Sequence, residues 1–268
     1  MSIPNSRPKR DSRRTISAWK NFVLLAVLSV AIALQLSYPL IEGERLRLVT
    51  IATVYWAAGA MLLHALLAYG LTYALRFLFI TFTYALIIEQ VGMRTTWPFG
   101  SYEYSPSLGY QIFDVPLVVP FAWIMMAHSV FIAARRVAPN FVFLVGGYGL
   151  MAWDLFLDPQ MVSAGRWSWE VSGRSVPFQP EIPLSNTFGW LLTGMGLMAL
   201  LDIFLPKKRR SFGSSRAVPE IFLALSWIGG IAINTFHFDR PGVALIGGTA
   251  LGALVIWYSL SVKYGRRD

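Results

Sequence analysis

Residues 21–40 read NFVLLAVLSVAIALQLSYPL, an apolar run without a charged side chain. A helix of about 20 apolar residues is long enough to cross the hydrocarbon core of a bilayer. Similar runs recur along the 268-residue chain, of which 55% is hydrophobic and 14% charged, whereas soluble domains carry about 25% charged residues. These runs predict an all-α fold, a polytopic transmembrane helical bundle.

The apolar runs predict eight membrane spans within a single transmembrane domain, residues 19–262. The spans are expected at about 19–40, 48–69, 71–91, 116–135, 140–158, 187–205, 218–236 and 242–261. A basic, disordered cytoplasmic arm is expected at 1–18, and a basic tail at 263–268. The first run continues past a possible cleavage site at 31–33, so we interpret it as a span and not as a removed signal.

The basic residues predict the orientation of the chain. Eight spans place both termini on one side, and with that side cytoplasmic it holds 17 of the 23 Lys and Arg residues, as the positive-inside rule expects. The clusters at 7–20, 207–216 and 263–267 lie beside span ends, where they would contact anionic headgroups of the lipid bilayer. We therefore predict a multi-pass protein of the cell (inner) membrane with cytoplasmic termini and no nucleic-acid partner.

The predicted outer side is rich in acidic residues instead of basic ones. Ten of the 14 carboxylates fall there, beside two long connections at about 92–115 and 159–186 that are rich in aromatic residues, Gly and Pro. Long loops of this kind are usually folded and functional. We expect two structured outer loops, re-entrant or interfacial, covering a site near the outer face.

Three carboxylates at the outer ends of spans are candidate catalytic groups. Asp154 and Asp158 are four residues apart and would share one helix face. Of two carboxyls in an apolar pocket, one can stay protonated and act as an acid. Glu89 ends the third span at a similar depth. Alternatively, the two aspartates bond to Arg94, Arg166 or backbone donors and only hold the loops in place, and Glu89 is an interfacial residue in water or in a salt bridge with Arg94.

His237 and Glu103 complete the set of candidate catalytic residues. His237 lies at the outer end of the seventh span and could titrate near neutral pH and position a water. His64 and His128 fall toward the cytoplasmic ends of their spans, so we expect ordinary hydrogen-bonded helix residues there. With three histidines, no cysteine and no His-rich pattern, we predict no metal site, disulfide or thiolate chemistry.

Aromatic residues cluster beside the carboxylates and could line an apolar slot that stabilises a developing cation. The alternative is an interfacial aromatic belt. The candidate substrate-binding residues are Trp97, Phe99, Tyr102, Tyr104, Trp123, Trp153, Trp167, Asn186 and Trp190, and Trp169 lies among them. Glycines within the spans predict close helix packing; they are Gly59, Gly189, Gly194, Gly196, Gly229, Gly230, Gly247, Gly248 and Gly252.

Two segments resemble the signatures of a known family. EQVGMRTTWPFGSYEYSPSLG (89–109), followed by VPLVVPFAW (115–123), resembles the first signature of the CruF-like carotenoid biosynthesis membrane proteins. WDLFLDPQMVSAGRWSWE (153–170), followed by IPLSNTFGW (182–190), resembles the second. The family includes carotenoid 1,2-hydratases and bisanhydrobacterioruberin hydratases, and the resemblance runs from about residue 50 to 260. Trp97 departs from it, since a smaller residue is expected before Pro98.

The resemblance implies a cofactor-independent carotenoid 1,2-hydratase. Such an enzyme adds water across the terminal C1–C2 double bond of an acyclic (ψ) end group on lycopene, γ-carotene or a C50 relative dissolved in the membrane. An acid would protonate C2, and water would capture the tertiary cation at C1. Asp154 or Glu89 is the candidate acid, and the residues expected to place or orient the water are Asp158, Glu103, Asn186 and His237.

Two other classes of function stay open at the level of the sequence. One is another carotenoid end-group enzyme, a cyclase, isomerase or transferase that shares the cation chemistry. Cyclisation or isomerisation would leave the mass of the pigment unchanged, whereas hydration adds one water. The other is a non-catalytic lipid-binding or transport protein, which would bind pigment without turnover.

Overall fold

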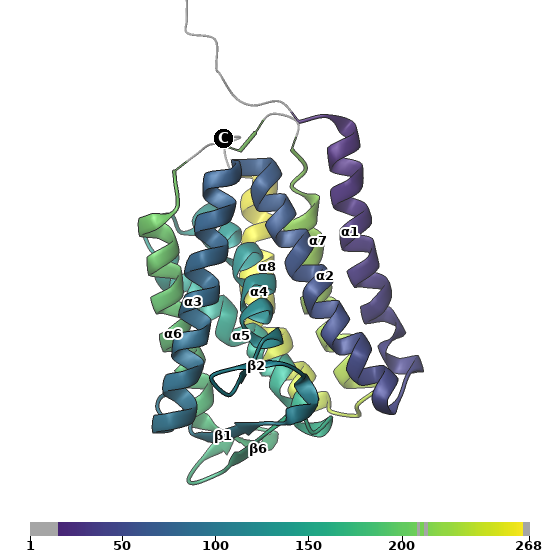
Figure 1. The fold of residues 1–268 in the computed structure, drawn as a ribbon, viewed down its shortest axis with the longest axis vertical. Helices are drawn as coiled ribbons and strands as arrows, with labels where there is room; N and C mark the ends of the chain where they lie inside the picture. Colours follow the sequence, from purple (N-terminus) through teal and green to yellow (C-terminus); the bar gives the residue numbers. More distant parts are fainter. Residues whose placement is uncertain (1–15, 208–209, 212–213, 265–268) are drawn as a thin grey trace, which may run out of the picture.

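The described part of the chain forms a bundle of eight long helices (Figure 1). The computed structural model describes residues 16–207, 210–211 and 214–264. Within them the long helices are α1 (Ala18–Ser37), α2 (Gly43–Tyr69), α3 (Leu71–Thr95), α4 (Val118–Val137), α5 (Val142–Ser163), α6 (Leu184–Phe204), α7 (Ala217–Phe236) and α8 (Pro241–Tyr264). Each predicted span coincides with one helix to within five residues at either end, so the predicted helical bundle is confirmed. Residues 1–15 of the expected arm and 265–268 of the tail lie outside the described residues.

Seven of the described helices are long and apolar enough to cross a membrane. The remaining long helix, α5, has 22 residues, but Asp154 and Asp158 lower its mean hydropathy. Large apolar side chains such as Phe79, Ile203 and Phe236 are exposed on the outside of the bundle. Exposure on this scale is typical of a surface that contacts lipid. The chain is therefore a multi-pass membrane protein.

The helices surround α4, of whose span 72% is buried. Figure 1 shows α3 and α6 at one edge of the bundle and α1 at the opposite edge. Helices α2 and α3 are separated only by Gly70, whose φ of +93° is a conformation that other residues rarely adopt. The chain reverses direction there at the end of the bundle that also carries the α6–α7 connection. The two long loops and all the strands lie at the other end.

Helices α5 and α6 approach each other too closely to leave room for side chains at the contact. A Cβ atom on Gly147 would lie 2.6 Å from the backbone nitrogen of Met195, and one on Gly194 would lie 3.0 Å from the Cα of Gly147. This contact confirms the packing role predicted for Gly194. The same prediction is wrong for Gly59 and Gly229, where a Cβ atom would meet no atom within 4 Å.

The two long loops fold against each other into one cap, which confirms that they are structured. Strand β1 (Ser101–Tyr104) of the first loop pairs antiparallel with β4 (Trp167–Glu170) of the second. The first loop also holds η2 (Pro106–Leu108) and the pair β2 (Gln111–Ile112) and β3 (Val115–Pro116). The second also holds the pair β5 (Ser175–Val176) and β6 (Gln179–Pro183). The β1–β4 pairing therefore joins segments that are far apart in the sequence.

Pro159, inside α5, helps to fasten the cap to the bundle. A proline has no backbone N–H, so the carbonyl of Leu155 one turn earlier loses its helical donor. The side-chain amide of Gln179 on β6 donates to that carbonyl at 3.3 Å. Arg240, just before α8, donates to the carbonyl of Pro159 at 2.7 Å. These two bonds hold the second loop and the start of α8 beside Asp158.

The α5–α6 contact predicts an asymmetry between two glycines. Gly147→Val should lower the free energy of unfolding by about 1–3 kcal/mol, because the added side chain overpacks a backbone contact that cannot give way. Gly59→Val is the matched control, with the same change of side chain in open space. Thermal unfolding in detergent, followed by circular dichroism, measures both. Equal transition temperatures for the two variants would contradict this account of the contact.

Candidate functional site

The paired strands of the cap direct aromatic rings toward the bundle. Tyr102 lies opposite Trp169, and Tyr104 lies opposite Trp167. Because side chains alternate along a strand, Glu103 between the two tyrosines faces outward and is exposed. The four rings all line a cavity beneath the cap.

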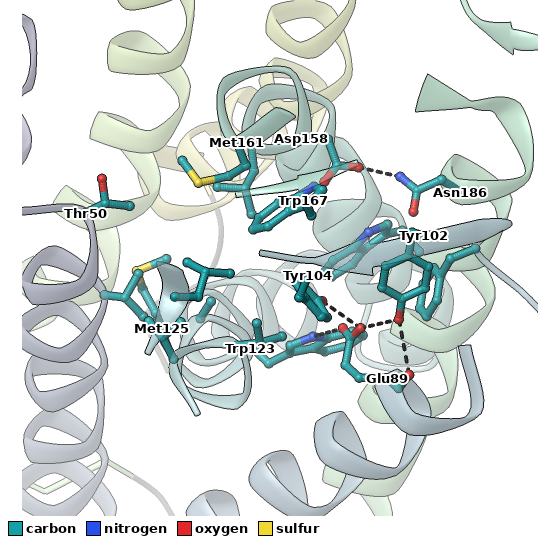
Figure 2. A pocket seen from close by; sticks show the side chains of 18 of the residues that line it. Thr50, Glu89, Tyr102, Tyr104, Trp123, Met125, Asp158, Met161, Trp167 and Asn186 are labelled. Carbon is teal, nitrogen blue, oxygen red and sulfur yellow. Dashed lines mark hydrogen bonds between the residues drawn. The ribbon is translucent and has the colours of Figure 1, made fainter. Parts of the chain in front are cut away.

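Glu89, near the C-terminal end of α3, is only 3% exposed. Its Oε2 atom accepts hydrogen bonds from the hydroxyls of Tyr102 at 2.6 Å and Tyr104 at 2.8 Å, and its Oε1 atom accepts one from the indole of Trp123 at 3.0 Å (Figure 2). All three bonds are donated to the carboxyl group, as an ionised carboxylate requires. Glu89 therefore links α3 to both the cap and α4. Its carboxyl oxygens already have hydrogen-bond donors, so the alternative ion pair with Arg94 is not required.

The hydroxyls of Tyr102 and Tyr104 stay protonated and so remain hydrogen-bond donors to Glu89. Burial, reinforced by the neighbouring Glu89 carboxylate, raises the pKa of Tyr102 and the pKa of Tyr104 far above the ordinary value for tyrosine. Both hydroxyls therefore keep their protons across the physiological pH range and continue to donate to Glu89.

Asp154 and Asp158 form a second buried acidic group, one turn apart on α5. They are 2% and 3% exposed. The side-chain amide of Asn186, in the first turn of α6, donates to Oδ2 of both carboxyls, at 3.2 Å for Asp154. The shared amide brings the two carboxyls close together, and two ionised carboxylates in such a position repel unless one of them is protonated. The Oδ1 atom of Asp154 has no hydrogen-bond partner among the described residues.

A cavity of about 80 Å³ lies between these two acidic groups. Figure 2 shows Glu89 and Asp158 at opposite sides of it, with the rings of Tyr104 and Trp167 between them. The indole rings of Trp123 and Trp190 stack with centroids 4.5 Å apart. The predicted residues that line the cavity are Glu89, Phe99, Tyr102, Tyr104, Trp123, Trp153, Asp158, Trp167, Asn186 and Trp190. Asp154 is connected to the cavity through Asn186.

Besides Asp154, three predicted site residues do not line the cavity. Glu103 faces away because it alternates with Tyr102 and Tyr104 along β1. Trp97 is 56% exposed, because the turn at this point directs Phe99 inward and Trp97 outward. His237 is exposed at the C-terminal end of α7, and it lines a neighbouring groove instead.

This turn links α3 to β1. It spans residues 97–99 and is closed by a hydrogen bond of 2.8 Å from the backbone N–H of Gly100 to the carbonyl of Thr96. A Cβ atom on Gly100 would lie 3.1 Å from side-chain atoms of Pro183 and Ser185. The glycine therefore lets the first loop pass close to the start of α6, where Asn186 lies.

The mainly apolar part of the cavity wall was not predicted from the sequence. The residues of this part include Thr50, Ile51, Val54, Leu108, Val119, Ala122, Met125, Leu157 and Met161. On α4, Val119 precedes Trp123 by one helical turn, so helical spacing from the predicted tryptophan would have found it. For α2 there was no such signal, since the helix contains no predicted site residue.

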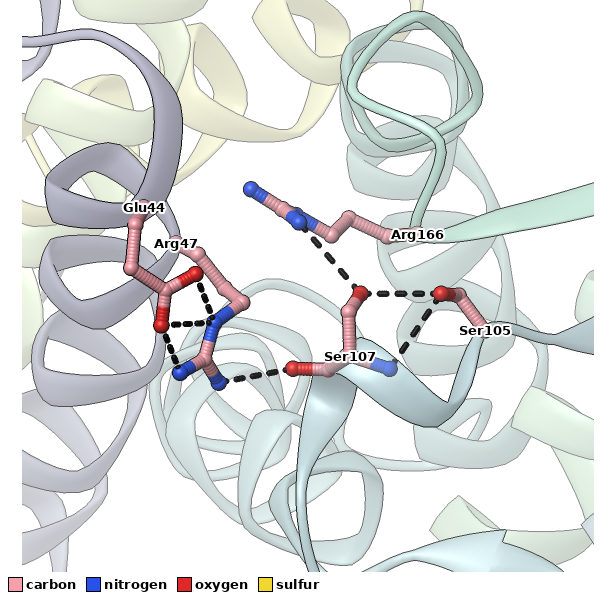
Figure 3. A network of polar contacts seen from close by, with 5 residues as sticks. All are labelled: Glu44, Arg47, Ser105, Ser107 and Arg166. Atoms are coloured by element: carbon pink, nitrogen blue, oxygen red, sulfur yellow. Dashed lines mark hydrogen bonds and ion pairs between the residues drawn. The ribbon is translucent and has the colours of Figure 1, made fainter.

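A polar network holds the cap at the rim of the cavity (Figure 3). Arg47 on α2 donates to Glu44 and, at 2.7 Å, to the backbone carbonyl of Ser107 in η2. Arg166 donates to the Ser107 hydroxyl at 3.4 Å, and its carbonyl accepts a bond of 2.8 Å from the N–H of Ser105. Arg166 therefore joins the second loop to the first through Ser105 and Ser107. The two aspartates share Asn186 as their hydrogen-bond donor instead.

The other two histidines lie away from the cavity. The Nδ1 atom of His64 lies 2.8 Å from Nε2 of His128, and the Nε2 atom of His64 lies 3.0 Å from the carbonyl of Ser215. Ser215 belongs to the α6–α7 connection, at the end of the bundle opposite the cap. The expectation of hydrogen-bonded helix residues at these positions is confirmed.

Residues 48–254 match the family described as carotenoid biosynthesis proteins. The chain belongs to this family. The matched residues include the whole cap, the Glu89 site and the aspartate pair, so the resemblance based on the two signatures is confirmed. The bisanhydrobacterioruberin hydratase of Haloarcula japonica is 34% identical over 184 residues, which span 65% of this chain and 60% of that relative. No solved structure matches this carotenoid biosynthesis protein.

The bonds to Glu89 predict a measurable coupling. Tyr104→Phe should lower the free energy of unfolding by about 1.5–3 kcal/mol, because it removes a hydrogen bond to a buried charged group. In a double-mutant cycle the loss should shrink when Glu89→Gln is already present. Tyr110→Phe is the control, since Tyr110 is 74% exposed and its ring lies outside the cavity. Additive effects of the two substitutions in detergent unfolding would contradict the coupling.

Proposed function

We propose that this carotenoid biosynthesis protein adds water across the terminal C1–C2 double bond of an acyclic carotenoid end group. The observation that carries the proposal is a buried aspartate pair bridged by Asn186, of which Asp158 lines the same aromatic-walled cavity as the separate carboxylate of Glu89. The family supports a carotenoid substrate, and the name of the Haloarcula japonica relative supports hydration.

The aspartate pair is the proton source in this proposal. Asp158 lines the cavity and would transfer the shared proton to C2, while Asp154 behind it takes part of the negative charge that remains. Glu89 already accepts three hydrogen bonds, which suits a permanent carboxylate better than an acid. The geometry thus favours Asp158 as the immediate donor, in place of Asp154 or Glu89.

The opposite side of the cavity suits the cation that this transfer creates. As the C2–H bond forms from the π electrons, positive charge develops at C1. The faces of Trp123 and Trp190 and the fixed carboxylate of Glu89 would stabilise that charge in a site without bulk water. Because aromatic rings form no bond with the cation, it stays available to a nucleophile.

The last step returns the proton. A water oriented by Asn186, which lines the cavity, would form the new C–O bond at C1. Its excess proton would pass to the aspartate pair, which restores the starting state. The sum is one alkene plus one water to one tertiary alcohol, with no electron transferred to a cofactor.

We also place the cap and the cavity at the outer face of the membrane, with both termini in the cytoplasm. The described residues at the opposite end include Arg76, Arg135, Arg136, Arg210 and Arg216, and the positive-inside rule favours the cytoplasm for that end. Exposed cysteines introduced into the cap and the α6–α7 connection, labelled with an impermeant maleimide, would test the orientation.

Product analysis tests the reaction. Expression in a lycopene-producing host should yield pigments that carry one additional water for each end group that reacts, as measured by mass spectrometry. Pigment of unchanged mass but altered retention would indicate cyclisation or isomerisation instead. Bound but unaltered pigment would indicate a binding protein.

The role of the pair predicts the effect of single substitutions. Asp158→Asn should lower turnover by about 100-fold or more, since a positioned general acid contributes about 10²–10⁴ in rate. Asp154→Asn should be impaired to a comparable extent, because the pair loses its shared proton. Glu170→Gln, on the outward face of β4, is the control and should hydrate like the parent. Full activity of Asp158→Asn would eliminate Asp158 as the acid.

A further inference from the structure

A second and larger pocket of about 530 Å³ lies beside the cavity. Its walls come from α1 and α2 on one side and from α5 and α7 on the other, within residues 28–39, 50–57, 153–161 and 222–237, with Met125 of α4 at its inner end. We call it the lateral groove. Figure 1 shows α1 at the edge of the bundle, beside α2 and α7.

The lateral groove is apolar and its rim faces the surroundings of the bundle. None of its lining residues is Asp, Glu, Lys or Arg. At the rim, Leu36 of α1 is 68% exposed and Phe236 of α7 is 87% exposed, on a surface that contacts lipid. A neutral hydrocarbon could therefore pass between bilayer and groove without meeting a carboxylate, a lysine or an arginine.

The lateral groove adjoins the cavity. Six residues line both spaces: Thr50, Val54, Met125, Trp153, Leu157 and Met161. Figure 2 shows Thr50, Met125 and Met161 together on the side of the cavity away from Asn186. Methionine side chains are unbranched and adaptable, so this junction can open for a narrow chain.

The two volumes indicate that different parts of a long molecule would bind in different spaces. The cavity of about 80 Å³ is too small for a whole carotenoid, so most of the substrate must lie elsewhere. The lateral groove, at about 530 Å³, falls within the usual 300–1,000 Å³ range of ligand sites.

We propose that the lateral groove binds the polyene chain of the carotenoid, which arrives from the bilayer between α1 and α7. The end group then passes between Met125 and Met161 to reach Asp158 and Glu89. This inference rests on the proposed function for the identity of the reacting end, but the binding of a long polyene can be tested separately.

Gly229 on α7 offers a direct test. It lines the lateral groove, and a Cβ atom there would meet no atom within 4 Å, so Gly229→Leu should fill the groove without disturbing the protein. Gly59→Leu is the matched control, since Gly59 is also helical and open but lines neither space. The neighbouring Gly230 is unsuitable, because its Cβ atom would lie 2.8 Å from Phe156.

The first measurement is lycopene retained by the purified protein and its turnover. Gly229→Leu should weaken apparent lycopene binding by about tenfold or more, through lost apolar contact, and should reduce hydration at limiting lycopene to match. Gly59→Leu should behave like the parent. Hydration of a short acyclic isoprenoid with the same terminal double bond should be spared in Gly229→Leu, because that molecule does not need the groove.

A second measurement uses smaller substitutions, because the chain has no cysteine. In Gly229→Cys, lycopene should protect the introduced thiol from a membrane-permeant maleimide. In Gly59→Cys it should not.

The outcomes separate the two proposals. Unchanged lycopene binding in Gly229→Leu together with unprotected thiol at position 229 overturns the groove proposal, and loss of a copurified phospholipid alone would assign the groove to a lipid. If the parent hydrates no pigment but binds lycopene, and Gly229→Leu loses that binding, the hydratase proposal fails while the groove proposal stands.

Discussion

A carboxylate buried at membrane depth must receive its hydrogen bonds from protein, because lipid provides no donor. Glu89 meets this constraint with three bonds, two from the cap and one from α4. Tyr102 and Tyr104 can reach it only if β1 lies over the end of α3, and β1 is held there by its pairing with β4. Glu89 therefore fixes β1, and through it β4, over the end of α3.

The aspartate pair meets the same constraint only in part. Asn186 serves both carboxyls, but one oxygen of Asp154 is left without a partner among the described residues. A buried group in this condition costs stability, and such groups concentrate where function requires them. Glu89 accepts three hydrogen bonds, whereas the pair shares one amide donor, and the rings of Tyr104 and Trp167 lie between the two acidic groups (Figure 2).

Particular residues show how far sequence reasoning reached. The eight helices followed from apolar runs, since few structures other than a spanning helix accommodate about 20 such residues. The alternation of SYEY and WSWE would have indicated two strands with rings on one face, and thus an outward Glu103, had it been recognised. His237 lies at the same end of the bundle as the cap but on α7, which adjoins the lateral groove and not the cavity. The position of a residue along its helix was predictable, but the direction in which its side chain faces was not.

The sequence by itself determined the helices, the end of the bundle at which carboxylates and aromatic residues gather, and the family. Only the tertiary structure decided which of them meet: Trp123 with Glu89, Asn186 with both aspartates, and α2 with the junction of cavity and groove. The physical reason lies in helix packing. The rotation and neighbours of each helix are set by contacts between distant segments, such as Gly147 against Gly194, and no local pattern encodes such a contact.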